Sequence, residues 1–98
     1  MEKAFRALLT RGINGLIEED GKYTNILAVM FRIAREFYEQ SYFIAFKKEG
    51  KKVIITDGNE NIFGELDLTE LNIPQNIWLV TEDYGDELVC IAMLPEEY

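Results

Sequence analysis

Histidine is absent from this 98-residue chain, and cysteine occurs once, at Cys90. Without histidine, one chain cannot form a Ser-His-Asp or Cys-His nucleophilic site, an imidazole-ligated zinc site or a histidine pH switch. Cys90 lies within the apolar run 88–94, so we expect a small buried side chain. A single thiol forms no internal disulfide, which agrees with a reducing compartment.

Glycine-rich phosphate loops and long apolar runs are also missing. Gly12 and Gly15 have no strand predicted before them and no Lys-Ser/Thr pair after them, so they do not form a nucleotide-binding loop. No run approaches the ~20 apolar residues of a bilayer span, and residues 1–6 lack the apolar core of a signal peptide. We therefore expect a cytoplasmic protein with no cofactor and no membrane partner.

The size and composition of the chain fit one domain spanning residues 1–98. Apolar residues make up 48% and charged residues 29%, close to the average of globular proteins. This composition argues against a disordered chain or a coiled coil, and the length leaves no room for a second core.

Two amphipathic helices are predicted in the first 40 residues. Over residues 2–19 the apolar positions recur at steps of three and four, at Phe5, Leu8, Leu9, Ile13, Leu16 and Ile17. Gly12 and Gly15 each cost about 1 kcal/mol in a helix, so the helix is loosened there or another segment packs closely against it. The second helix is predicted over 24–40, with Thr24 as its N-cap.

Five strands are predicted in the rest of the chain, over residues 42–48, 51–56, 61–66, 76–82 and 87–94. Turns containing Gly50, Gly58 and Gly85 connect successive strands, which indicates hairpins. The predicted fold class is therefore α+β, with two N-terminal helices packed on a mostly antiparallel sheet.

Residues 57–61, DGNEN, match the first half of a calcium-binding loop. The second half fails, because Ile62 stands where such a loop needs glycine and Leu68 where it needs a bidentate glutamate. We expect a turn held by side-chain hydrogen bonds of Asp and Asn at this position, and no metal site in the chain.

The last predicted hairpin is apolar on both of its faces. Trp78, Val80 and Ile91 alternate along the strands with Leu79 and Cys90. Either the two helices divide between the faces, or a second copy of the chain supplies the missing layer. A homodimer is the expectation that we favour slightly.

Charge is divided unevenly along the chain. Residues 1–52 hold all ten Lys and Arg and seven acids, net +3, whereas residues 53–98 hold eleven acids and no base, which together give −8. An acidic half repels phosphate, so we expect no direct binding of nucleic acid, and it attracts basic protein surfaces. Lys47, Lys48, Lys51 and Lys52 form a basic hairpin tip, either as solubilising charges or as a contact for the acidic hairpin of another copy.

Eight residues form the predicted partner-binding site. In two places a tyrosine lies among carboxylates, and an arginine can stack on the ring while pairing with a carboxylate. The site comprises Glu82, Asp83, Tyr84, Asp86 and Glu87 in the last hairpin and Glu96, Glu97 and Tyr98 at the end of the sequence. No residue is assigned a catalytic role.

Our first hypothesis is a non-catalytic interaction protein, an inhibitor or nucleic-acid mimic that binds a basic protein partner. The same charges also serve plain solvation. A second hypothesis is a dimeric scaffold or regulatory subunit that binds through its apolar sheet face, and a third is a metal-dependent enzyme domain that uses carboxylates alone. The first hypothesis requires carboxylates gathered on one surface without neighbouring Lys or Arg of the same molecule.

Overall fold

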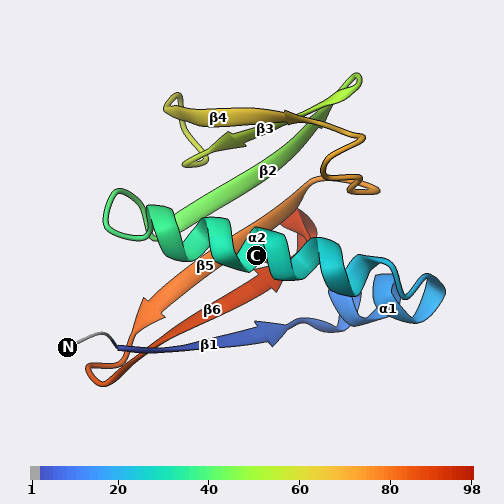
Figure 1. The fold of residues 1–98 in the computed structure, drawn as a ribbon. Coiled ribbons are helices and arrows are strands. Elements are labelled where there is room, and N and C mark those ends of the chain that lie inside the picture. The colour runs from blue at the N-terminus through green and yellow to red at the C-terminus, as the bar shows by residue number, and fades with distance from the viewer. Residues whose placement is uncertain (1–2) are drawn as a thin grey trace.

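The computed structural model describes residues 3–98, which form two helices packed on a six-stranded sheet (Figure 1). This α+β architecture confirms the predicted fold class, with six strands in place of about five. In chain order the elements are β1 (Ala4–Leu9), α1 (Arg11–Glu19), α2 (Tyr23–Phe37), β2 (Phe43–Glu49), β3 (Lys52–Thr56), β4 (Ile62–Asp67), β5 (Ile77–Asp83), β6 (Glu87–Met93) and the 3-10 turn η1 (Pro95–Glu97).

The sheet has the strand order β1-β6-β5-β2-β3-β4. Its hairpins β2–β3, β3–β4 and β5–β6 are antiparallel, as predicted, and β5 returns to pair with the free side of β2. The one parallel pair joins β1 to β6, with Phe5 opposite Leu88 and Ala7 opposite Cys90. The sheet is therefore mixed, and its first strand comes from a segment for which a helix was predicted.

The prediction of one helix over residues 2–19 is wrong for its N-terminal half. Residue 2 lies outside the described residues, residues 4–9 form β1, and only Arg11–Glu19 is helical. Phe5, Ala7 and Leu9 also alternate with period two, and so short an apolar pattern fits a strand as well as a helix. Thr10 begins the helix instead, because its hydroxyl accepts a hydrogen bond from the Ile13 N–H at 3.4 Å.

The second helix was predicted correctly in place and is shorter at its end. α2 begins at Tyr23, one residue before the predicted Thr24 cap. Lys22 occupies the N-cap position, and its side chain forms no capping hydrogen bond. It ends at Phe37, whose carbonyl accepts hydrogen bonds from both the Gln40 and the Ser41 N–H at 2.9 Å. Residues 38–40 therefore form a turn rather than the last part of the helix.

The predicted turns are confirmed by their backbone geometry. Gly50, Gly58 and Gly85 have φ angles of 59°, 88° and 91°. Between β3 and β4, Asp57 Oδ1 accepts a hydrogen bond from the Asn59 N–H at 2.9 Å, and its Oδ2 accepts one from the Asn61 side-chain amide at 2.7 Å. The segment 57–61 is thus a turn held by its Asp and Asn side chains, as expected.

Both helices pack on the same face of the sheet. Ile13 of α1 and Leu27, Met30 and Ala34 of α2 share one buried cluster with every second residue of the central strands, namely Ile44, Phe46, Val53, Ile55, Ile77, Leu79, Cys90 and Ala92. One of our two alternatives was that the helices divide between the two faces of the sheet. The structure shows that they do not. No helix within residues 3–98 has the length and apolar character needed to cross a bilayer.

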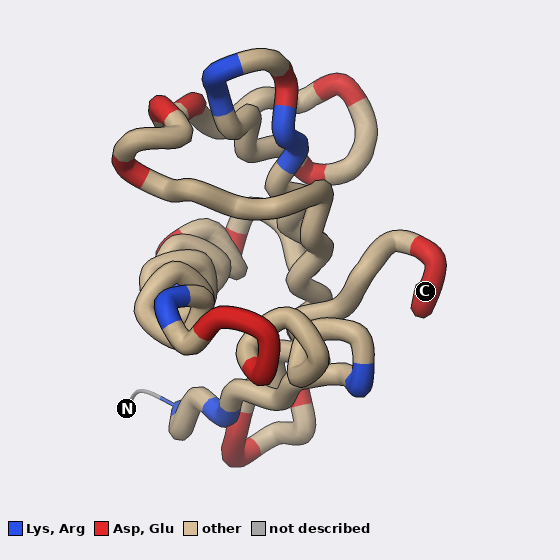
Figure 2. Tube along the Cα trace, turned by 90° about the vertical axis from the view of Figure 1, so that its right-hand side faces the viewer, with Lys and Arg blue, Asp and Glu red and all other residues tan. Residues whose placement is uncertain are grey.

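The opposite face of the sheet carries no helix, and we call it the helix-free face. By strand alternation it presents Arg6, Leu8, Phe43, Ala45, Lys47, Lys52, Ile54, Trp78, Val80, Glu82, Glu87, Val89, Ile91 and Met93. The segment after β6 turns onto this side, away from α2 (Figure 2). This face and its acidic end hold most of the candidate functional residues.

Candidate functional site

The β5–β6 hairpin brings five of the eight predicted site residues together. Tyr84 N–H donates to the Glu87 carbonyl at 2.9 Å, which closes the turn, and Gly85 N–H donates to Asp83 Oδ1 at 2.8 Å. Because successive side chains of a strand point to opposite faces, Glu82 and Glu87 lie on the helix-free side while Asp83 lies on the helix side. The carboxylates of the hairpin are therefore split between two faces.

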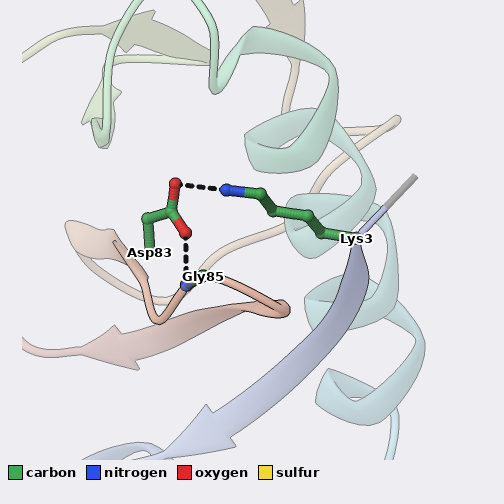
Figure 3. A network of polar contacts seen from close by, with 3 residues as sticks. All are labelled: Lys3, Asp83 and Gly85. Carbon is green, nitrogen blue, oxygen red and sulfur yellow. Dashed lines mark hydrogen bonds and ion pairs between the residues drawn. The ribbon is translucent and has the colours of Figure 1, made fainter. Parts of the chain in front are cut away.

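Asp83 forms an ion pair with Lys3, the residue that directly precedes β1 (Figure 3). Lys3 Nζ lies 2.5 Å from Asp83 Oδ2. The hydrogen bond from Lys3, and next the one from the Gly85 N–H, lowers the pKa of the Asp83 carboxyl below its ordinary value. Both side chains are about 40% exposed, at 39% and 40%, so solvent screens the pair. Its charge is nevertheless compensated within the molecule.

Glu87 is compensated in the same way on the other face. Arg6 Nη1 of β1 lies 3.8 Å from Glu87 Oε1. Neither partner was predicted, because Lys3 and Arg6 fall in the segment expected to be helical, whereas the parallel β1–β6 pairing puts them beside the acidic hairpin. The alternation of Phe5, Ala7 and Leu9 was the signal that could have identified this strand.

The tip of the hairpin keeps uncompensated acidic groups. The Tyr84 hydroxyl donates to Glu82 Oε2 at 2.6 Å, and this hydrogen bond raises the pKa of the Tyr84 phenol above its ordinary value. Tyr84 is 60% exposed. For Asp86, the structure records no side-chain hydrogen bond or ion pair with any of residues 3–98. Two of the four hairpin carboxylates, Glu82 and Asp86, thus lack a cationic partner in this part of the chain.

Glu97 was predicted to bind a partner, and its carboxylate accepts hydrogen bonds within the molecule, near the start of α1. Its carboxylate accepts hydrogen bonds from the Thr10 hydroxyl at 2.6 Å, the Leu94 N–H at 2.8 Å and the Gly12 N–H at 3.0 Å. These donors, of which Thr10 contributes most, lower the pKa of the Glu97 carboxyl. Glu97 therefore stabilises the first turn of α1, and the close approach expected near Gly12 is that of this tail.

The acidic residues of the second half do not gather on one surface. Figure 2 shows them at separated places along the chain, including the C-terminal tail, with Lys and Arg positions among them. Glu65 pairs with Lys52 at 3.0 Å, and this contact raises the pKa of Lys52. The hydrogen bonds that Asp57 accepts from Asn61 and Asn59 lower its pKa. The condition set for the first hypothesis is met only at the tip of the hairpin.

Tyr98 joins an aromatic cluster on the helix-free face. Its ring lies 5.7 Å from that of Phe43 and 5.6 Å from that of Trp78, and the Phe43 and Trp78 rings lie 5.1 Å apart, all in edge-on geometry. Within the cluster, Tyr98 is 70% exposed, and Phe43 and Trp78 are partly exposed. On the same face, Leu8 is 39% exposed and Ile91 is partly exposed. Glu96 precedes it, exposed and without a recorded side-chain partner among residues 3–98.

The remaining ionisable groups give no support to carboxylate catalysis. Every described carboxyl whose pKa departs from its ordinary value, namely Asp20, Asp57, Asp83 and Glu97, is shifted downward by hydrogen bonds. A general acid needs the opposite shift. Within residues 3–98, no three His, Cys, Asp or Glu side chains come together as metal ligands.

The chain matches no family model, and neither curated proteins nor solved structures include a significant match to it. The candidate surfaces are therefore interpreted from their own geometry.

Proposed function

We propose that this chain is a non-catalytic interaction protein that self-associates as a homodimer through its helix-free face. The observation that carries the proposal is the position of both helices on one side of the sheet, which leaves the cluster of Phe43, Trp78 and Tyr98 partly exposed on the other. Aromatic rings with neighbouring aliphatic side chains are typical centres of protein interfaces.

The charges at the two ends of this face favour a second copy as the occupant. Lys47 and Lys52 lie at the end near the β2–β3 turn, and Glu82 and Glu87 lie at the opposite end, because β2 and β5 are antiparallel. A twofold axis in the interface that reverses the strand direction places the basic end of one copy over the acidic end of the other. Since Lys52 and Glu87 also have partners within their own chain, these charges set the orientation more than the affinity.

Light scattering on a size-exclusion column tests the proposal over about 5–200 µM protein, the range in which weak and moderate dimers dissociate. We expect a dimer that persists when sodium chloride is raised, because apolar contacts are not screened. Ile91→Lys places a charge on the helix-free face and is expected to give a folded monomer. A wild-type chain that stays monomeric at every concentration would refute the proposal.

Ala28→Lys is the control for Ile91→Lys. Ala28 is exposed on α2, which packs on the opposite face of the sheet. We expect this variant to dimerise like the wild type. Dissociation by both variants alike would indicate a general effect of added charge rather than an interface at Ile91.

The tip of the acidic hairpin is a second candidate site, in line with our first hypothesis. Glu82 and Asp86 lack a cationic partner within residues 3–98, and Tyr84 stands exposed beside them. Such a tip suits an arginine-rich patch of a basic protein partner. In this role the protein is an inhibitor or adaptor of the cytoplasm, where its one thiol, Cys90, would remain reduced.

Capture of partners from the host lysate at about 50 and 500 mM salt tests the second candidate, since screening weakens attraction between exposed charges. We expect a basic protein that is lost at high salt and that the double variant Glu82→Gln/Asp86→Asn fails to retain. The control is Asp83→Asn/Glu87→Gln, which removes carboxylates already paired with Lys3 and Arg6. Equal capture by both double variants would contradict a binding role of the tip.

A further inference from the structure

An open depression of about 390 Å³ lies between the α2–β2 loop and the β3–β4 turn. Figure 1 shows these two segments at the same end of the molecule. Residues 40–43 line one side, and residues 57–59 line the other. This volume lies within the range of small-ligand sites, and the lining combines aromatic rings with side-chain amides, a hydroxyl and one carboxylate.

The electrostatics of this depression favour a cation. Asp57 is its only charged lining residue, and no Lys or Arg belongs to the lining. Each oxygen of the Asp57 carboxylate accepts one hydrogen bond, Oδ1 from Asn59 and Oδ2 from Asn61, so each keeps a further acceptor position. α2 ends at Phe37, three residues before Gln40, and the C-terminal end of a helix carries partial negative charge.

The aromatic side of the depression is exposed, and its two rings are in contact. Tyr42 is 58% exposed, and its ring meets that of Phe43 edge-on at 6.5 Å between centroids. The turn lies directly on Phe43, because a Cβ at Gly58 would fall 2.8 Å from Phe43 Cε1. The turn that carries Asp57 is therefore packed on Phe43, the residue next to Tyr42, before any ligand arrives.

We propose that this depression binds a guanidinium group, with the Asp57 carboxylate as its bidentate partner and the Tyr42 ring as its stacking surface. A planar guanidinium matches a carboxylate with two free acceptor positions and stacks on an aromatic face, which a compact ammonium does less well. Gln40 and Asn59 also belong to the lining, and each carries a side-chain oxygen that can accept a hydrogen bond. An anion is disfavoured, because the lining carries no positive charge.

This inference does not depend on the homodimer. The guanidinium can belong to an arginine side chain of a partner protein or to a small free compound such as arginine itself. Both share the same chemistry at the site, so one titration tests the site and a second identifies the source.

Nuclear magnetic resonance titration of the full ¹⁵N-labelled chain tests the proposal with N-acetyl-arginine amide. We expect saturable shifts confined to residues 40–43 and 57–59, with affinity in the range of about 1–10 mM for so small a ligand. N-acetyl-citrulline amide, which has nearly the same shape and no charge, is expected to bind at least about tenfold more weakly. Equal shifts by the two compounds, or no saturation with arginine amide, would refute the site.

Two variants and two matched controls assign the contacts. Asp57→Asn and Tyr42→Leu are each expected to weaken arginine binding by about fivefold or more. Asp67→Asn and Tyr23→Leu change the same residue types away from the depression and are expected to bind like the wild type. Because Tyr42→Leu leaves the turn at 57–61 untouched, unaltered binding by this variant would overturn the stacking role even if Asp57→Asn disturbs the turn.

A second titration with a short arginine-containing peptide, set against the same peptide with citrulline, identifies the source. Tighter binding of the arginine peptide than of arginine amide assigns the site to a partner protein, whereas equal affinity assigns it to a free guanidinium compound. Either result supports the site. Identical binding of the arginine and citrulline peptides counts against it, whatever the oligomeric state proves to be.

Discussion

The Gly12 N–H donates a hydrogen bond to Glu97 Oε2 at 3.0 Å across 85 positions of sequence. Gly12 lies in the first turn of α1, where backbone N–H groups lack partners within the helix, and Glu97 lies in η1 after the last strand. The segment that follows the sheet thereby completes the start of the first helix.

The two glycines of α1 are expected to respond oppositely to alanine. A Cβ at Gly12 would lie 2.6 Å from Leu94 Cδ1 and 2.8 Å from Glu97 Oε1, whereas at Gly15 it would come within 4 Å of no described atom beyond its chain neighbours and the backbone of its own helix. Gly15→Ala should raise the free energy of unfolding by about 1 kcal/mol through helix propensity. Gly12→Ala should lower it by about 1–2 kcal/mol, since Glu97 must move. Urea denaturation measures both, and an equal gain in the two variants would contradict the contact.

Glu97→Gln is expected to lower the melting temperature at pH 7 by about 3–6 °C, the effect of a weakened helix cap in a domain of this size. Hydrogen bonds from Thr10, Leu94 and Gly12 hold the pKa of Glu97 below its ordinary value of 4.5. Its stabilising effect is therefore complete above pH 4.5 and disappears as the pH falls through the lower pKa of the folded state. In thermal melts from pH 7 to 3, the difference in melting temperature between the wild type and Glu97→Gln should shrink only below about pH 4.5. Glu96→Gln is the control, and a difference that widens in acid would disprove the role.

Cys90 is expected to react with thiol reagents only when the chain unfolds. Its side chain is fully buried on the helix side of β6, and desolvation raises its pKa to about 11. At pH 8 only about one thiol in a thousand would be ionised, and the reagent has no access to it. The rate of labelling should rise with urea in parallel with global unfolding. Rapid labelling in native buffer would show that the core opens locally near β6.

The helices and hairpins that were predicted correctly have strong local signals. α2 has a broad apolar stripe over four turns, and each hairpin has a glycine where φ is positive. β1 has only six residues, and Phe5, Leu8 and Leu9 match the helical period by chance. Its strand conformation depends on pairing with β6, which lies more than 80 positions away, and no local pattern records that pairing.

The same error explains why the ion pairs of the acidic hairpin were not foreseen. With Lys3 and Arg6 assigned to a helix, nothing suggested that they would stand beside Asp83 and Glu87. Counting charges along the sequence gives the net charge of residues 53–98. The electrostatic potential at a surface depends instead on which strands are neighbours in the sheet. The aromatic cluster was missed for a related reason, since Tyr98 reaches Trp78 only because the tail folds back onto the helix-free face.

Gly58 and Gly85 are expected to differ in their tolerance of alanine although their φ angles are nearly equal, at 88° and 91°. Both variants carry the strain of a left-handed residue with a side chain, about 1 kcal/mol. At Gly85 the Cβ enters open space, whereas at Gly58 it lies 2.8 Å from the Phe43 ring, so Gly58→Ala should lose about 1–3 kcal/mol more. Because Phe43 also contacts Trp78, this variant alone should shift the tryptophan emission and weaken arginine amide binding. Equal losses in urea denaturation, with unchanged emission, would show that the β3–β4 turn does not rest on Phe43.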